Sequence, residues 1–226
     1  MYFTTPRAWD NLPLRLTTEE IRDPHEVIHE YYSAHDMPRA RQILNKWLCS
    51  TSKEKPGKQS ASGLQFFYER TESLIEAAFL VEQLDNSGRK AIIMQNEDDE
   101  EIDLMNPRLF CAWIRQSKGE GVAYREIWDN FPRSLSYKEF LNPYLVFEKF
   151  FLFLTLGEWR ELLRELFSMG LSCRTFFDET LDFDMLGIKK HLEKLIEACH
   201  LIDVRERRQA FYDKVMSEAD EKKGEA

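Results

Sequence analysis

The sequence predicts a mainly α protein, a multi-helix bundle-like domain of roughly six to eight helices. Three observations lead to this prediction. Short polar residues recur three positions before a Glu or Gln, which is the pattern of a helix start. The segments that follow carry apolar residues at spacings of three and four. Hydrophobic residues make up 43% of the chain and aromatic residues 13%, which is enough material for a packed core.

The predicted helix starts are capping boxes, in which the polar side chain and the Glu or Gln both bind backbone N–H groups of the first turn. Asp36, with Pro38 two residues later, adds a further start, because proline is tolerated in a first helical turn. The boxes are Thr17-x-x-Glu20, Asp23-x-x-Glu26, Ser62-x-x-Gln65, Ser136-x-x-Glu139 and Thr155-x-x-Glu158.

The periodic segments predict which helix faces are buried. Residues 62–84 and 185–202 each carry one apolar stripe, and residues 155–169 form an amphipathic helix. Residues 143–154 are apolar almost all round, so we expect a central helix there. The glutamates of the first segment fall off its stripe, and Glu197 falls roughly 160° from the centre of the stripe in 185–202, toward solvent. Those glutamates are Glu69, Glu72 and Glu76.

We expect residues 1–216 to form a single helical domain, with a polar Pro-Gly linker near 53–62 inside it. A small β-hairpin is predicted near 90–105, and an ordered loop is the alternative there. Residues 217–226 are predicted to be a disordered C-terminal tail.

Composition points to a soluble, cytoplasmic protein without a membrane span. The first residues lack the basic and apolar regions of a signal peptide. The longest apolar stretch, residues 144–157, is short and interrupted by charges. Four scattered cysteines without a C-x-x-C pair are typical of buried thiols in a reducing compartment. The formal net charge of −9 disfavours nucleic-acid binding outside a local basic patch.

One motif points to metal chemistry. His25-Glu26-x-x-His29 places two imidazoles one helical turn apart, with a carboxylate beside them. With His35 the stretch resembles the metzincin pattern H-E-x-x-H-x-x-G-x-x-H. That resemblance implies a zinc ion held by the three histidines, and Glu26 as the general base that activates its bound water.

Three features favour a structural interpretation of the motif. Tyr32 stands where metzincins have the glycine that turns the chain, so His35 would lie roughly 120° round a straight helix from His29. Only 24 residues precede the motif, and they show no strand pattern. Asp23 makes Glu26 the second half of a capping box. We therefore predict no metal and no cofactor, with a zinc-dependent metallohydrolase as the alternative.

A di-iron site is a further metal hypothesis, because Glu-x-x-His occurs at Glu26 and again at Glu197. The predicted solvent orientation of Glu197 disfavours it. A second alternative is a nucleic-acid-associated regulator that uses the basic 39–58 segment. Its candidate residues are Arg39, Arg41 and Lys46, and a solvated helix face is the favoured interpretation of them.

The function predicted first is a non-catalytic helical protein that acts through protein–protein contacts. No glycine-rich phosphate loop, G-x-S-x-G elbow or C-x-x-C pair is present in the sequence. Trp9, Trp113 and Trp128 stand near predicted element ends, and any that are exposed would anchor a protein partner. The partner and the oligomeric state are not predicted.

Overall fold

The computed structural model of the chain describes residues 7–51, 60–84, 92–93, 106–111, 124–172 and 184–224, although not the side chains at 124–126 and 207–224. These residues are mainly helical, which confirms the predicted fold class. The elements are α1 (Thr18–Arg22), α2 (Pro24–Ala34), α3 (Met37–Thr51), α4 (Ala61–Gln83), the 3-10 helix η2 (Pro107–Leu109), α5 (Tyr124–Asp129), α6 (Tyr137–Leu141), α7 (Leu145–Phe153), α8 (Leu156–Leu171) and α9 (Met185–Gly224).

Most helix starts lie where the capping pattern predicts them. Both halves of the capping box are present at Thr17, Ser136 and Thr155. Asp23 caps α2 through the Glu26 N–H, with Pro24 as the first helical residue. The return bond predicted from Glu26 does not form, because the Asp23 N–H donates to the Glu19 carbonyl at the end of α1. The box predicted at Ser62 is wrong. Helix α4 begins two residues earlier, where the Ser60 hydroxyl accepts a hydrogen bond of 3.1 Å from the Gly63 N–H.

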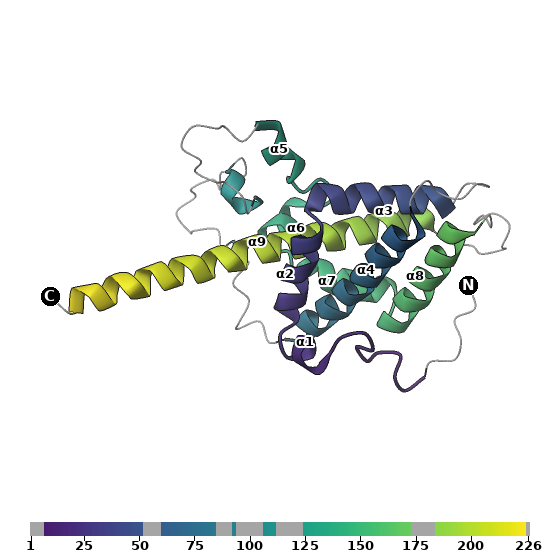
Figure 1. Ribbon diagram of the computed structural model, residues 1–226, viewed down its shortest axis with the longest axis horizontal. Helices are drawn as coiled ribbons and strands as arrows, with labels where there is room; N and C mark the ends of the chain where they lie inside the picture. Colours follow the sequence, from purple (N-terminus) through teal and green to yellow (C-terminus); the bar gives the residue numbers. More distant parts are fainter. Residues whose placement is uncertain are drawn as a thin grey trace.

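The longest helix, α9, organises the fold. Its first half packs against α2, α3 and α7, while α4 packs against α2, α7 and α8 (Figure 1). Beyond these contacts the ribbon of α9 projects away from the other helices and remains helical to Gly224. The disordered tail predicted for residues 217–226 stays a prediction.

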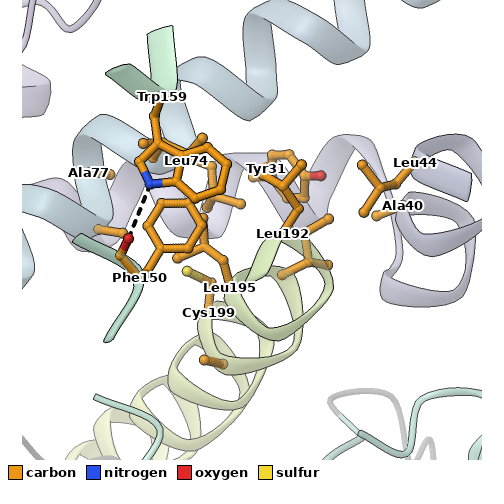
Figure 2. Close-up of a cluster of buried hydrophobic side chains, with 14 of the residues drawn as sticks. Tyr31, Ala40, Leu44, Leu74, Ala77, Phe150, Trp159, Leu192, Leu195 and Cys199 are labelled. Carbon is orange, nitrogen blue, oxygen red and sulfur yellow. Dashed lines mark hydrogen bonds between the residues drawn. The ribbon is translucent and has the colours of Figure 1, made fainter. Parts of the chain in front are cut away.

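The core lies between α2, α3, α4, α7, α8 and α9. Figure 2 shows Leu195 and Cys199 of α9 close to the aromatic pair Phe150 and Trp159. The two rings stack at 4.2 Å between centroids, and the Trp159 indole N–H donates to the Phe150 carbonyl at 3.2 Å. This bond pairs the only polar atom of the buried Trp159 side chain, which offsets the cost of removing that atom from water.

Helix α7 differs from its prediction as an all-round buried helix. Phe147 and Phe150 are fully buried, whereas the Leu152 side chain is 78% exposed. A helix buries all its faces only where neighbours surround it, and the contacts of α7 lie toward α4, α6 and α9.

The orientation predicted for three glutamates is also wrong. Glu72, Glu76 and Glu197 are buried, because each has a cationic partner on another segment of the chain. The predicted linker at 53–62 and hairpin at 90–105 lie mostly outside the described residues. Within the described part of the chain, no helix combines the length and the apolar character needed to cross a membrane.

Candidate functional site

The first two histidines of the zinc-protease motif face α9. His25 Nδ1 lies 2.9 Å from Glu206 Oε2, and His29 Nδ1 lies 3.3 Å from Asp203 Oδ1. Residues four apart on α2 thus meet residues three apart on α9, which is the natural spacing for two packed helices. The histidine pair joins two helices in this structure.

The third histidine, His35, faces a different helix. It follows the end of α2, and its ring packs against Phe66 and Phe67 of α4, with centroid distances of 5.4 and 5.6 Å. Burial there lowers the pKa of His35, and the nearby Arg39 lowers it further. Among the described residues, no three or more His, Cys, Asp or Glu side chains form a group that could hold a metal ion.

The basic segment proposed for nucleic acid is only partly a solvated face. The Arg41 guanidinium binds Glu197 at 2.5 Å and donates to the carbonyls of Asp129 and Phe131. Arg39 and Lys46 are exposed. Residues 52–59 lie outside the described residues, and the nucleic-acid alternative stays a prediction.

Next to Arg41, an open cleft of about 590 Å³ lies between α3, α9 and the segment after α5. Its cations bind groups of the protein itself. Lys189 donates to Asn45 at 3.0 Å, and Arg133 lies 3.4 Å from the carboxylate of Asp129. Glu193 lies 3.6 Å from Lys189, so carboxylates offset part of the positive charge of this cleft.

A second surface, formed over α4 and α8, rests on more buried polar groups than the cleft beside Arg41. Residues 7–16, called the arm below, run across α4 and α8 before α1 begins. Glu76 of α4 is fully buried beneath the arm. Its carboxylate accepts hydrogen bonds from the backbone N–H groups of Leu14, Arg15 and Leu16, at 3.0, 2.8 and 3.2 Å. One carboxylate thus satisfies three consecutive amides of a non-helical segment.

Arg160 of α8 completes this attachment from the other side. Its guanidinium binds Glu76 at 2.8–2.9 Å and donates to the arm carbonyls of Asp10, at 2.7 Å, and Leu12. The arm approaches α8 so closely that a Cβ atom on Gly157 would lie 2.9 Å from the Cβ of Asp10. The arm is therefore held through its backbone by buried ionic groups.

The side chains of the arm are left largely free for contacts outside the protein. Trp9, Leu12 and Leu14 are 51%, 54% and 59% exposed. The Arg7 guanidinium lies 5.8 Å from the centroid of the Trp9 ring, in cation–π contact. An ordered segment that directs three large apolar side chains into solvent is the candidate binding surface of this protein.

The sequence indicates one residue of this surface but not the buried residues that support it. Of the three tryptophans predicted as anchors if exposed, Trp9 is exposed, Trp128 packs against Phe110 at 5.5 Å between ring centroids, and Trp113 lies outside the described residues. Glu76 and Arg160 were missed, because their partners lie 60 or more positions away in sequence. A buried glutamate one turn from apolar residues gives no local sign of the arm it binds.

Glu139, at the start of α6, forms another buried ionic cluster. It caps α6 with Ser136 and binds Lys149 at 2.9 Å and Lys194 at 2.6 Å. Burial by itself raises the pKa of Glu139, but the hydrogen bonds from Lys194, from the Ser136 backbone and from Lys149 outweigh it and lower the pKa from 4.5 to about 2. The folded state thus favours the charged form.

This cluster predicts an acid-dependent loss of stability. A carboxyl whose pKa is lower in the folded protein stabilises it above pH 4.5, and that contribution disappears as the pH falls toward about 2. We expect the contribution to be on the order of 3 kcal/mol. Urea unfolding of the protein and of Glu139→Gln from neutral to acidic pH measures it. The difference between the two curves should shrink in acid, and curves that stay parallel would refute the assignment.

Comparison of the chain with protein-family models, with curated proteins and with solved structures finds no match. No function is transferred from a relative. The arm and the ionic groups beneath it are therefore the observations from which a function is inferred.

Proposed function

We propose that this protein acts through contact with another protein, without catalysing a reaction, and that the arm is its binding surface. The observation that carries the proposal is the contrast within the arm. Its backbone is fixed by Glu76 and Arg160, while Trp9, Leu12 and Leu14 extend into solvent. An arm that served only to cover the core would turn these side chains inward.

Fixing the arm before binding has a direct energetic consequence. Ordering a loop on binding costs conformational entropy, and a segment that is already ordered avoids that cost. Tryptophan and arginine are also the residues most enriched at the energetic centres of protein interfaces. Arg7 and Trp9 stand together at the exposed end of the arm, 5.8 Å apart.

The exposed area favours a transient contact with a different protein over a permanent dimer. Three side chains that are little more than half exposed offer on the order of 300 Å². A standard interface buries about 800 Å² on each partner, and permanent dimers bury more. We therefore infer a partner that presents a small apolar groove, which receives Trp9 with Leu12 and Leu14 beside it.

The experiment combines capture with reconstitution. The protein and a Trp9→Ala variant are used to capture partners, and each candidate is then purified and titrated against both proteins. We expect Trp9→Ala to weaken binding by about 2 kcal/mol or more, roughly thirtyfold, because truncation empties the partner's groove. Leu152→Ala is the matched control, since it removes an exposed apolar side chain from α7.

Binding by the unmodified protein and the two variants shows whether the arm is the binding surface. Binding lost in Trp9→Ala and kept in Leu152→Ala supports the proposal. Equal binding by all three proteins contradicts it, as does binding that depends on Leu152 alone. Sedimentation of the free protein tests whether the arm binds a second copy of this chain instead of a different protein. A dimer abolished by Trp9→Ala would show that the arm binds a second copy of this chain.

A further inference from the structure

A small cavity lies between α6, α7 and the first half of α9, away from the arm. Its volume is about 160 Å³, enough for one compact polyatomic ion. Cationic side chains from two helices converge on it. The cavity is lined by Glu139, Val146, Lys149, Lys190, His191 and Lys194.

The charges around this cavity do not balance. Lys149 and Lys194 both bind the one carboxylate, Glu139, at 2.9 and 2.6 Å. Lys190 lines the same cavity and forms no ion pair with any described residue. Three ammonium groups therefore face one carboxylate, which leaves a formal charge of +2 on a chain whose net charge is −9. Positive charge concentrated in this way attracts anions.

We propose that this cavity binds a phosphate-type dianion. The ammonium groups of Lys149 and Lys194 each have three N–H donors and use one on Glu139, so donors remain for an anion. Lys190 supplies the third cation. An anion with two negative charges neutralises the surplus of +2, and charge-assisted hydrogen bonds from ammonium to phosphate oxygens are strong.

The larger cleft beside α3 is a weaker anion site. Its lining includes the carboxylates of Asp129 and Glu193, and Arg41 is already bound to Glu197. Lys189, which lines that cleft, is paired with Asn45 and Glu193. Lys189 lines the larger cleft and its neighbour Lys190 lines the small cavity, so a substitution at Lys189 is the matched control for one at Lys190.

His191 gives the proposed site a dependence on pH. Its ring stacks on Phe153 at 4.2 Å, which holds it at the cavity wall. Burial lowers the pKa of His191, and Lys194 and Lys190 lower it further, while Asp184 beside α9 and Glu139 of α6 raise it. Lys149 of α7 is the other charged group that lines the cavity. A bound dianion would raise the pKa of His191, so binding takes up a proton and strengthens as the pH falls.

The test titrates inorganic phosphate into the full-length protein at constant ionic strength, observed by calorimetry and by NMR of the α9 amides. We expect saturable binding with shifts centred on Lys190, His191 and Lys194. Lys190→Gln should weaken it about tenfold or more. Lys189→Gln, one residue earlier and in the other cleft, should leave it unchanged. Lys190 is exposed and Lys189 partly exposed, and both variants are expected to fold.

Sulfate, which remains a dianion across the range, tests the pH dependence. Its affinity should rise as the pH falls through the histidine range, and His191→Gln should remove that rise. Equal weakening by Lys189→Gln and Lys190→Gln would show adventitious ion binding only and overturn the proposal. Absence of saturable binding at millimolar phosphate would overturn it as well. Phosphate esters of small molecules, titrated next, distinguish a free ion from a phosphorylated ligand.

Discussion

Replacing Glu76 by alanine is expected to lower the free energy of unfolding by about 3–5 kcal/mol. The substitution leaves the Arg160 guanidinium buried without its carboxylate, and leaves three arm amides without their acceptor. Removing one partner of a buried ion pair costs far more than the pair itself contributes, because the remaining charge stays desolvated. Denaturant unfolding followed by circular dichroism measures the loss.

Glu69→Ala is the matched control for this prediction. Glu69 lies two turns before Glu76 on α4 and forms an exposed ion pair with Arg15, at 3.2 Å. Exposed pairs contribute about 0–1 kcal/mol, so the control should lose little. If Glu76→Ala were as mild as Glu69→Ala, the carboxylate would not hold the arm and the basis of the proposed function would be lost.

The second large effect is expected in the core. Phe150→Ala should cost about 3–5 kcal/mol, because Phe150 is fully buried and stacks on Trp159 at 4.2 Å. Surrounding side chains of α4, α8 and α9 limit how far the core can collapse into the cavity (Figure 2). Tryptophan fluorescence gives an independent signal, since the indole loses its stacking partner.

Leu152→Ala on the same helix separates burial from helix propensity. Leu152 is largely exposed, so its replacement should change stability by no more than about 0.5 kcal/mol. A loss below about 1 kcal/mol in Phe150→Ala would show that α7 is peripheral. A large loss in Leu152→Ala would show that this side chain is buried in solution, against another part of the chain or a second copy of it.

Local rules in the sequence account for much of the fold. A capping box depends on residues three positions apart, and those at Thr17, Ser136 and Thr155 begin helices as predicted. The stripe of α9 is buried as its periodicity predicts. The helix start predicted at Ser62 is wrong because Ser60 carries the same hydroxyl two residues earlier and caps the helix there.

The candidate site depends on long-range pairs that periodicity cannot reveal. Glu197 was expected in solvent because it lies opposite the stripe of α9, yet Arg41 of α3 covers that side. Glu76 was assigned to the polar side of α4 for the same reason, and the arm covers it. An apolar stripe marks one buried face of a helix, but a helix that packs on several sides has other buried faces as well. Charged side chains are buried on those faces where they meet a partner of opposite charge.

The zinc-protease motif is another case in which contacts that are distant in sequence decide the surroundings of a local pattern. Its fixed letters describe spacing along one helix, and His25 and His29 do share a face of α2. What faces them is decided by α9, more than 170 positions later, where Asp203 and Glu206 stand. A short motif therefore indicates a metal site only together with the groups that the fold brings to it.

Amide hydrogen exchange at Leu14, Arg15 and Leu16 tests the central claim, that the arm is fixed before it meets a partner. We expect these three amides to exchange slowly in the free protein, because Glu76 holds their N–H groups. Arg160→Ala removes the cation that pairs with the Glu76 carboxylate and the two guanidinium donors that bind arm carbonyls. In this variant the protection of the three amides should fall markedly. Exchange at the rate of an unstructured peptide in the unmodified protein would contradict the account.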